Sequence, residues 1–191
     1  MKKNRVVVTG LGVVSSIGIG KDEFWKNAIS GKSGISKVSG FDTKEFRCHC
    51  AGEVKNFHPE EYISKRRIPF LGRTSQLSIA AAILAFKDAK LSFKNIGKEA
   101  GVIMGTTMGE RPMEESIDTW VKEGHSKISK SKILQSQASN ISTNLAIYFK
   151  IPGINYLIPT ACSAGNYAVG YGFDLIKAGE LKYALVGGAD A

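Results

Sequence analysis

INYLIPTACSAG, residues 154–165, decides the fold. Its first five residues form a short, mainly apolar run that predicts a buried strand over 154–159, and Pro159 ends it. Small residues follow, and apolar positions at helical spacing continue beyond them, which predicts a helix over 162–177. A strand that leads directly into a helix is the repeating unit of α/β proteins. Cys162 lies at the junction of the two elements.

The rest of the chain repeats this alternation of strand and helix. Further strands are predicted at 5–9, 102–105 and 183–187, and residues 33–60 are predicted to be a loop with short extended pieces. Further helices are predicted at 21–30, 74–89 and 135–148, and residues 111–133 are expected to hold a helix followed by a basic loop. The predicted fold class is α/β, with a mixed, largely parallel sheet and helices on both faces.

Composition narrows the setting of the protein. The 191 residues are 43% hydrophobic and 23% charged, with a formal net charge of +9. No apolar run reaches the ~18 residues that span a bilayer, and the apolar run at 6–8 is too short for a secretory signal. Three cysteines in 191 residues argue against a disulfide framework. A cytoplasmic protein without membrane insertion is therefore expected.

Cys162 is the candidate nucleophile. A sulfur close to the start of a helix lies near backbone N–H groups that have no partner within the helix, and these groups favour negative charge. The thiolate form is the nucleophile, and the same N–H groups can stabilise an oxyanion on a thioester carbonyl that the sulfur attacks. The small neighbours Ala161, Ser163, Ala164 and Gly165 leave room for a substrate. The alternative is an inert cysteine that fills space between strand and helix.

The chain resembles the β-ketoacyl-acyl carrier protein synthases, specifically the chain-elongating type II condensing enzymes, which have a thiolase-like fold. The resemblance extends from residue 4 to the end. It is carried by the stretches 5–15 with Gly18, 31–35 with Phe41-Asp42, 101–106, and 161–165 leading to 187–190. By this resemblance, residues 1–191 are a β-ketoacyl synthase N-terminal domain that stops before the C-terminal half of the fold.

The resemblance implies a function for Cys162. In the family, this cysteine accepts an acyl chain from an acidic acyl carrier protein, and malonyl carrier protein then loses CO₂ and condenses with it to a 3-oxoacyl product. No metal or organic cofactor is implied, and a homodimer is. Two histidines and a lysine of the family lie beyond residue 191, and His49, His58 and His125 do not match them. The isolated chain is therefore expected to be inactive, and the alternative is a non-catalytic half-domain that makes only dimer or carrier-protein contacts.

The resemblance also suggests roles for side chains outside the cysteine motif. Met108 falls where relatives place a residue that lines the acyl pocket, and Glu110-Arg111-Pro112 departs from the glycine-rich continuation usual in elongating relatives. This departure leaves a polyketide-type or specialised-lipid substrate open beside a fatty acid. Docking of the carrier protein is expected at a group of basic residues, which are Lys65, Arg66, Arg67, Arg73, Lys127 and Lys130.

Three other site types are disfavoured. Gly10-x-Gly12 lacks the third glycine of a dinucleotide-binding motif, since residue 15 is serine. Cys48-His49-Cys50 with His58 does not have zinc-site spacing. The basic stretches carry almost none of the interleaved aromatic residues typical of single-strand nucleic-acid binders, so no nucleic-acid partner is expected.

Overall fold

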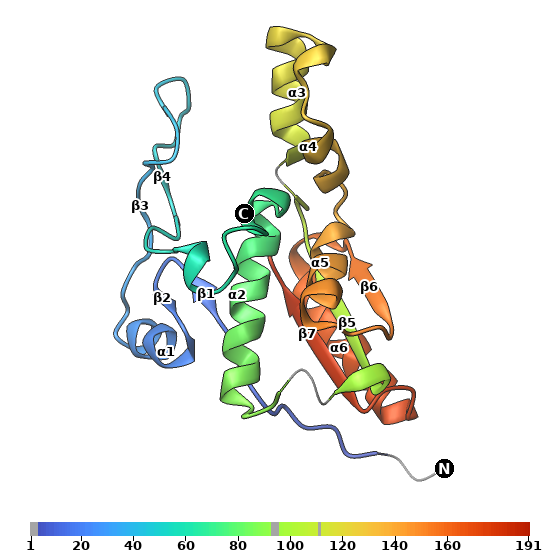
Figure 1. The fold of residues 1–191 in the computed structure, drawn as a ribbon. Coiled ribbons are helices and arrows are strands. Elements are labelled where there is room, and N and C mark those ends of the chain that lie inside the picture. Colours follow the sequence, from blue (N-terminus) through green and yellow to red (C-terminus); the bar gives the residue numbers. More distant parts are fainter. Residues whose placement is uncertain (1–3, 93–95, 111) are drawn as a thin grey trace.

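A three-stranded parallel sheet forms the centre of the computed structural model, which describes residues 4–92, 96–110 and 112–191 (Figure 1). Strand β5 (Ala100–Gly105) lies between β6 (Asn155–Ile158) and β7 (Tyr183–Gly188). Gly105 pairs with Ile158 on one side and with Gly188 on the other. The carboxyl ends of all three strands therefore lie at one edge of the sheet.

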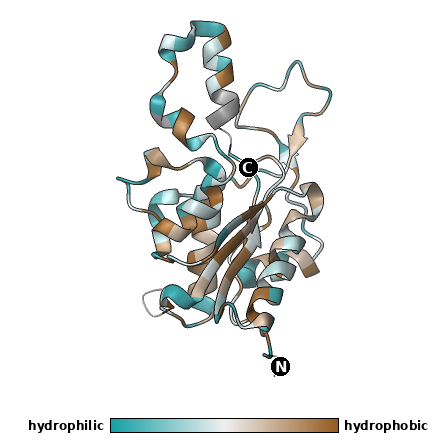
Figure 2. Ribbon diagram, turned by 90° about the vertical axis from the view of Figure 1, so that its right-hand side faces the viewer, coloured by the Kyte–Doolittle hydropathy of each residue, from teal (hydrophilic) through white to brown (hydrophobic). Residues whose placement is uncertain are grey.

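Helices cover both faces of the sheet, as the sequence predicts. Alternate side chains of a strand point to opposite faces. Val102 and Met104 accordingly pack in the cluster that includes α2 (Arg73–Asp88) and α5 (Asn140–Phe149), whereas Ile103 packs against α6 (Ala164–Ala178) on the opposite face. All six residues of β5 are buried, and Figure 2 shows the hydrophobic colouring concentrated on these central strands. The predicted α/β class is confirmed.

Smaller elements surround this core. Two short hairpins, β1–β2 (Val14–Ser15, Gly18–Ile19) and β3–β4 (Ser36–Lys37, Cys50–Ala51), lie on the side of α1 (Lys21–Ile29). Helices α3 (Pro112–Glu123) and α4 (Lys130–Gln135) project beyond the sheet as an arm (Figure 1). The 3₁₀ turns of the described residues are Pro59–Glu61, Ile68–Phe70, Gly97–Glu99, His125–Lys127 and Ala161–Ser163.

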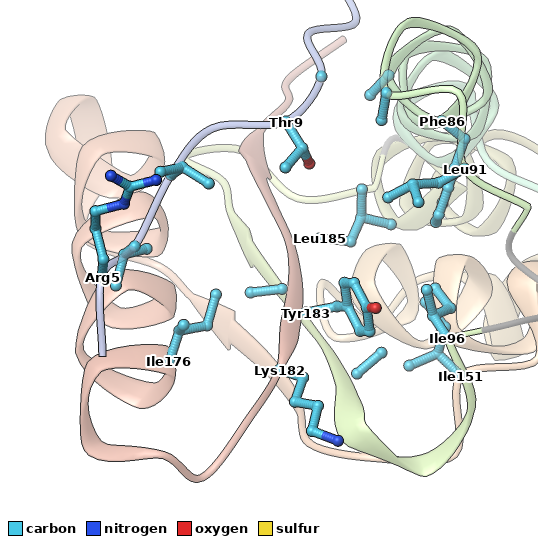
Figure 3. A pocket seen from close by; sticks show the side chains of 17 residues that line it. Arg5, Thr9, Phe86, Leu91, Ile96, Ile151, Ile176, Lys182, Tyr183 and Leu185 are labelled. Carbon is cyan, nitrogen blue, oxygen red and sulfur yellow. The ribbon is translucent and has the colours of Figure 1, made fainter. Parts of the chain in front are cut away.

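The predicted strand at 5–9 is wrong. The segment belongs to no strand, and Val7 and Val8 are 59% and 77% exposed. A mainly apolar cavity of about 300 Å³ separates it from the nearest sheet edge, because residues 5–7 line one side, and Lys182 with residues 183–185 of β7 lines the other (Figure 3). A strand needs a backbone partner within hydrogen-bonding distance, and the cavity occupies that place.

Other boundaries shift for local reasons. The loop predicted after α3 contains a 3₁₀ turn and α4, and the helix predicted from 135 begins only at Asn140. Arg111 lies outside the described residues. The helix predicted from 162 begins at Ala164, because residues 162 and 163 belong to the 3₁₀ turn Ala161–Ser163.

Gly10 and Gly12, the residues that suggested a dinucleotide motif, pack against α2. A Cβ on Gly10 would lie 2.7 Å from the backbone nitrogen of Ala89, and one on Gly12 would lie 2.7 Å from that of Ala85. These distances are shorter than any van der Waals contact. The two glycines therefore allow the N-terminal segment to cross the helix closely.

Candidate active site

Three connections leave the carboxyl edge of the sheet and form the candidate site. Cys162 follows β6, Met108 follows β5 and Asp190 follows β7. Because the strands are parallel and neighbours in register, the three connections start side by side. In open α/β sheets, ligands bind outside the carboxyl ends of the strands.

The connection after β6 is a strained elbow. Thr160 has φ −103° and ψ 40°, and Ala161 adopts the left-handed φ of +51°, which costs a non-glycine residue about 1 kcal/mol or more. The 3₁₀ turn Ala161–Ser163 then leads into α6, and the Ser163 hydroxyl donates to the Thr160 carbonyl at 2.9 Å. Cys162 sits at the centre of this turn as an exposed free thiol.

Glycines allow the elbow to rest directly on the strand ends. A Cβ on Gly105 would lie 2.6 Å from the backbone nitrogen of Gly165, and one on Gly188 would lie 2.9 Å from the Cα of Gly165. Any larger residue at position 105 or 188 would push the first turn of α6 off the sheet. Backbone contact between helix and strands thus fixes the position of Cys162.

The start of α6 supplies the electrostatic environment of the thiol. Cys162 lies two residues before Ala164, the first residue of this 15-residue helix. The first N–H groups of a helix have no partner within it, and the helix dipole places partial positive charge there. An anionic sulfur, or an oxyanion formed on a carbonyl that the sulfur attacks, is stabilised at such a position.

The turn after β5 carries Met108, whose side chain is 68% exposed. Asp190 holds this turn, because its Oδ1 accepts hydrogen bonds from the Thr106 hydroxyl at 2.7 Å and from the N–H groups of Thr107 and Met108 at 2.8 Å each. Partial loss of hydration raises the pKa of Asp190, and the hydrogen bonds led by that from Met108 outweigh it, so the pKa lies below its usual range. The sequence prediction assigns no role to Asp190, although a carboxylate directly after a predicted strand is a usable signal.

Glu110 closes the same turn and was also missed as a site residue. Its side chain is only 3% exposed, and its Oε1 accepts hydrogen bonds from the hydroxyl and, at 3.1 Å, the N–H of Ser75. Burial raises the pKa of this carboxyl above its usual range, against the hydrogen bonds from Ser75 and Thr74. One signal was present in the sequence: α2 begins after Gly72, which has no side chain to cap a helix.

A family model described as "Beta-ketoacyl synthase, N-terminal domain" matches residues 3–191. The chain belongs to this family. The ketoacyl synthase chain is 32% identical over 193 residues to 3-oxoacyl-[acyl-carrier-protein] synthase 2 of Synechocystis sp., covering 100% of this chain and 46% of that protein. It is also 32% identical over 194 residues to the chloroplastic 3-oxoacyl-[acyl-carrier-protein] synthase I of Arabidopsis thaliana, covering 99% and 41%.

Solved structures agree with this assignment. The ishigamide ketosynthase/chain length factor structure matches with a TM-score of 0.93 and 37% identity, over 99% of this chain and 48% of that one. A type II polyketide ketosynthase bound to a hexaketide, in complex with its acyl-carrier protein, matches with a TM-score of 0.81 and 30% identity, over 100% and 46%. The thiolase-like fold is therefore confirmed. The ketoacyl synthase chain spans about half the length of these relatives.

The predicted docking residues occupy neighbouring segments. Lys65, Arg66 and Arg67 are exposed in the loop before the 3₁₀ turn Ile68–Phe70, and the Gln135 amide of α4 donates to the Pro69 carbonyl at 3.3 Å. Lys127 and Lys130, also exposed, lie on the arm that carries α4.

Arg73 differs from the other five basic residues. Its side chain is half-buried, and its guanidinium carbon lies 4.7 Å from the ring centroid of Phe57. Burial lowers the pKa of its guanidinium. Arg73 therefore packs the start of α2 against the loop before it. Less of its side-chain surface is accessible to a partner protein than that of the five exposed basic residues.

The stretch Cys48-His49-Cys50 makes local hydrogen bonds. The Cys48 thiol donates to the Cys50 carbonyl at 3.3 Å, and His49 Nδ1 lies 3.1 Å from the Thr43 hydroxyl. Residues 4–92, 96–110 and 112–191 contain no group of three His, Cys, Asp or Glu side chains arranged to hold a metal ion. Within the same residues, no helix is long and apolar enough to cross a bilayer.

Proposed function

We propose that the full-length protein containing this chain is a 3-oxoacyl-[acyl-carrier-protein] synthase with Cys162 as its acyl acceptor. The observation that carries the proposal is the exposed thiol of Cys162 on a strained elbow two residues before α6, at the carboxyl edge of the sheet. Family membership and the 3-oxoacyl synthase relatives support it.

The geometry fits an acyl transfer to sulfur. The Cys162 thiolate attacks the thioester carbonyl of an acyl carrier protein, and a C–S bond forms as the carbonyl oxygen becomes an oxyanion near the start of α6. When the carbonyl reforms, the carrier thiolate leaves and takes a proton, so that the acyl group stays on Cys162. The family resemblance implies the second half-reaction: a malonyl thioester loses CO₂, its carbanion attacks the acyl carbonyl, and the bond to Cys162 breaks.

Selective acylation of Cys162 tests this function. All three cysteines of the chain are free and exposed, so a difference in their labelling rates reports nucleophilicity more than access. The full-length protein would be incubated with an acyl-pantetheine thioester and digested, and the three cysteine peptides would be quantified by mass spectrometry.

The expected result is acylation at Cys162 at least about tenfold faster than at Cys48 or Cys50, because only Cys162 lies at the start of a long helix. Cys162→Ala is expected to leave only the slow acylation of Cys48 and Cys50, and the control variant Cys48→Ala is expected to leave the acylation rate of Cys162 unchanged. Equal labelling of the three cysteines would instead favour the second hypothesis, a non-catalytic half-domain that contributes only dimer or carrier-protein contacts.

We also infer that an acidic carrier protein docks on the exposed basic residues Lys65, Arg66, Arg67, Lys127 and Lys130. The net charge of +9 and the related ketosynthase solved with its acyl-carrier protein support this partner. Opposite charges across an interface speed the encounter of the two proteins more than they tighten binding, and salt screens them. A homodimer is part of the same proposal, since it is implied by the family.

Charge reversal tests the docking surface. Changing Lys65, Arg66 and Arg67 together to Glu is expected to slow acyl transfer from the carrier protein about tenfold at low salt, and less at high salt. The matched control changes Lys26, Lys32 and Lys37 to Glu, which alters the net charge equally on exposed residues around α1. Equal slowing in both variants would mean that overall charge, rather than this surface, controls the encounter. Transfer from acyl-pantetheine should be unaffected in both.

A further inference from the structure

Glu110 is a buried carboxylate that the proposed acyl transfer does not use. It ends the turn that begins after β5, and its side chain reaches the start of α2, 35 residues earlier in the chain. There its Oε1 accepts hydrogen bonds from the N–H and the hydroxyl of Ser75. A carboxylate in this place caps the helix, because the first N–H groups of α2 need acceptors and favour negative charge.

The start of α2 is shaped to receive this side chain. The residue before the helix is Gly72, which supplies no capping oxygen of its own. A Cβ at position 72 would lie 2.6 Å from the Glu110 carboxyl carbon. Gly72 therefore opens the space that the carboxylate of Glu110 fills.

Further hydrogen bonds tie the same part of the turn to two helices. The Thr74 hydroxyl of α2 donates to the Gly109 carbonyl at 2.8 Å. The Asn144 amide of α5 donates to the Ser75 hydroxyl at 2.9 Å, and that hydroxyl in turn bonds Glu110. The second half of the turn is thus held by the helices, whereas the first half is held by Asp190.

Met108 lies between these two anchors. Its N–H is bonded to Asp190, and the next residue, Gly109, has a φ of +75° and donates its N–H to the Thr106 hydroxyl at 3.0 Å. The backbone on both sides of Met108 is therefore fixed, while its side chain remains exposed. Because Met108 lies two residues from Glu110, loss of the Glu110 anchor is expected to displace the turn that carries this side chain.

The burial of Glu110 destabilises the fold, so a gain in stability does not explain why a glutamate lies here. Its Oε2 is buried without a hydrogen-bond partner among the described residues. Burying a carboxylate with an unpaired oxygen destabilises the fold, so a serine or asparagine cap at position 72 would hold α2 with less penalty. The distinctive consequence of using Glu110 is that the cap of α2 and the Met108 turn become one unit.

We propose that Glu110 is a positioning residue that sets where Met108 stands in the acyl pocket, and thereby which acyl-chain lengths Cys162 accepts. The inference rests on the proposed function and on the family resemblance, which implies that Met108 lines the acyl pocket. One methylene in an apolar pocket changes discrimination about tenfold or more, so a small displacement of a pocket wall changes the length profile.

The test compares Glu110→Ala and Glu110→Gln in the full-length protein. Short, medium and long straight-chain acyl-pantetheine thioesters would be supplied, and the acylation rate of Cys162 would be followed for each by mass spectrometry. Glu110→Ala removes the acceptor for Ser75 and is expected to change the long-to-short rate ratio about fivefold or more. Glu110→Gln keeps an acceptor oxygen and is expected to restore the ratio to within about twofold of wild type.

The matched controls are Glu99→Ala and Glu99→Gln, which alter an exposed glutamate that pairs with Lys182 at 2.7 Å. Both controls should leave the length profile unchanged. A uniform loss across all lengths in Glu110→Ala would overturn the proposal, because a merely structural role lowers every rate alike. Failure of Glu110→Gln to restore the profile would also overturn it.

Two further measurements keep the test decisive. If Glu110→Ala does not fold, Ser75→Ala removes the hydroxyl that Glu110 binds, and it should shift the ratio in the same direction by about twofold. Amide hydrogen exchange at Met108 and Gly109 should accelerate in either variant and stay unchanged in the Glu99 controls. If no thioester acylates wild-type Cys162, the proposed function fails, and exchange at these two amides still shows whether Glu110 anchors the turn.

Discussion

The elbow after β6 and the turn after β5 start side by side, yet they are held in different ways. The elbow that carries Cys162 rests on Gly105 and Gly188 through backbone contacts that leave no space for a side chain. The turn that carries Met108 is held by two carboxylates, those of Asp190 and Glu110. Steric contact therefore fixes the nucleophile, and hydrogen bonds to ionisable groups fix the proposed pocket wall.

This difference matches what each residue is proposed to do. A nucleophile must stand at a fixed position relative to the helix amides that stabilise its charge, and contact between backbones gives little freedom. A pocket wall needs a position that sequence changes can adjust, and hydrogen-bonded anchors from distant segments can be exchanged singly. We therefore expect a single added methyl group to cause a large loss of stability at the elbow. Substitutions at the anchors of the turn should each cause a smaller loss.

The largest expected effect comes from Gly105→Ala. Its Cβ would overlap the start of α6, since the Gly165 nitrogen would be only 2.6 Å away, and overpacking of this kind costs about 3 kcal/mol. Acylation of Cys162 should fall with it, because the elbow is pushed from the sheet. Urea denaturation measures the first effect and mass spectrometry the second.

Gly187→Ala is the matched control for this change. It lies in the neighbouring strand, where an added Cβ would meet only the Met104 side chain at an ordinary 3.8 Å. Its free energy of unfolding should stay within about 1 kcal/mol of wild type. Equal destabilisation by the two substitutions would show that the close contact with α6 does not fix the elbow.

Much of the elbow was predictable from the sequence because its causes are local. The apolar run before Pro159 predicted β6, and the small residues around Cys162 predicted a tight passage into a helix. The left-handed φ of Ala161 was not predictable, because alanine rarely adopts it and the surrounding packing imposes it.

The anchors of the Met108 turn were not predictable, because their causes are far apart in the chain. Asp190 reaches residues more than eighty positions away, and Glu110 reaches Ser75. The strand predicted at 5–9 failed for a related reason: a β-branched run predicts an extended backbone, whereas pairing depends on which edge lies beside it. The local sequence pattern predicts helices and extended segments, whereas the contacts between distant segments depend on how these elements pack in the fold.

Asp190→Ala should destabilise the protein less than Gly105→Ala does. It removes the acceptor of three hydrogen bonds, one from the Thr106 hydroxyl and two from backbone N–H groups. Water can replace part of what is lost, so the free energy of unfolding should fall by about 1–2 kcal/mol. Asp190→Asn keeps an acceptor and should lose roughly half as much. Identical losses in the two variants would mean that the negative charge, rather than the hydrogen bonds, holds the turn.

The contributions of Asp190 and Glu110 to the free energy of unfolding should change with pH in opposite directions. The folded-state pKa of Asp190 is lowered, so its contribution to stability is present above the unfolded pKa and is lost as pH falls through the folded pKa. The folded-state pKa of Glu110 is raised, mainly by burial, so its contribution is present below the unfolded pKa and is lost as pH rises through the folded one.

Glu110→Gln isolates the smaller of these effects. Glutamine does not ionise, so the free energy of unfolding of wild type minus that of the variant should fall as pH rises from acid toward neutral, by denaturant titration at each pH. A difference that instead grows with pH would mean that the helix start stabilises the charged form of Glu110 more than burial opposes it.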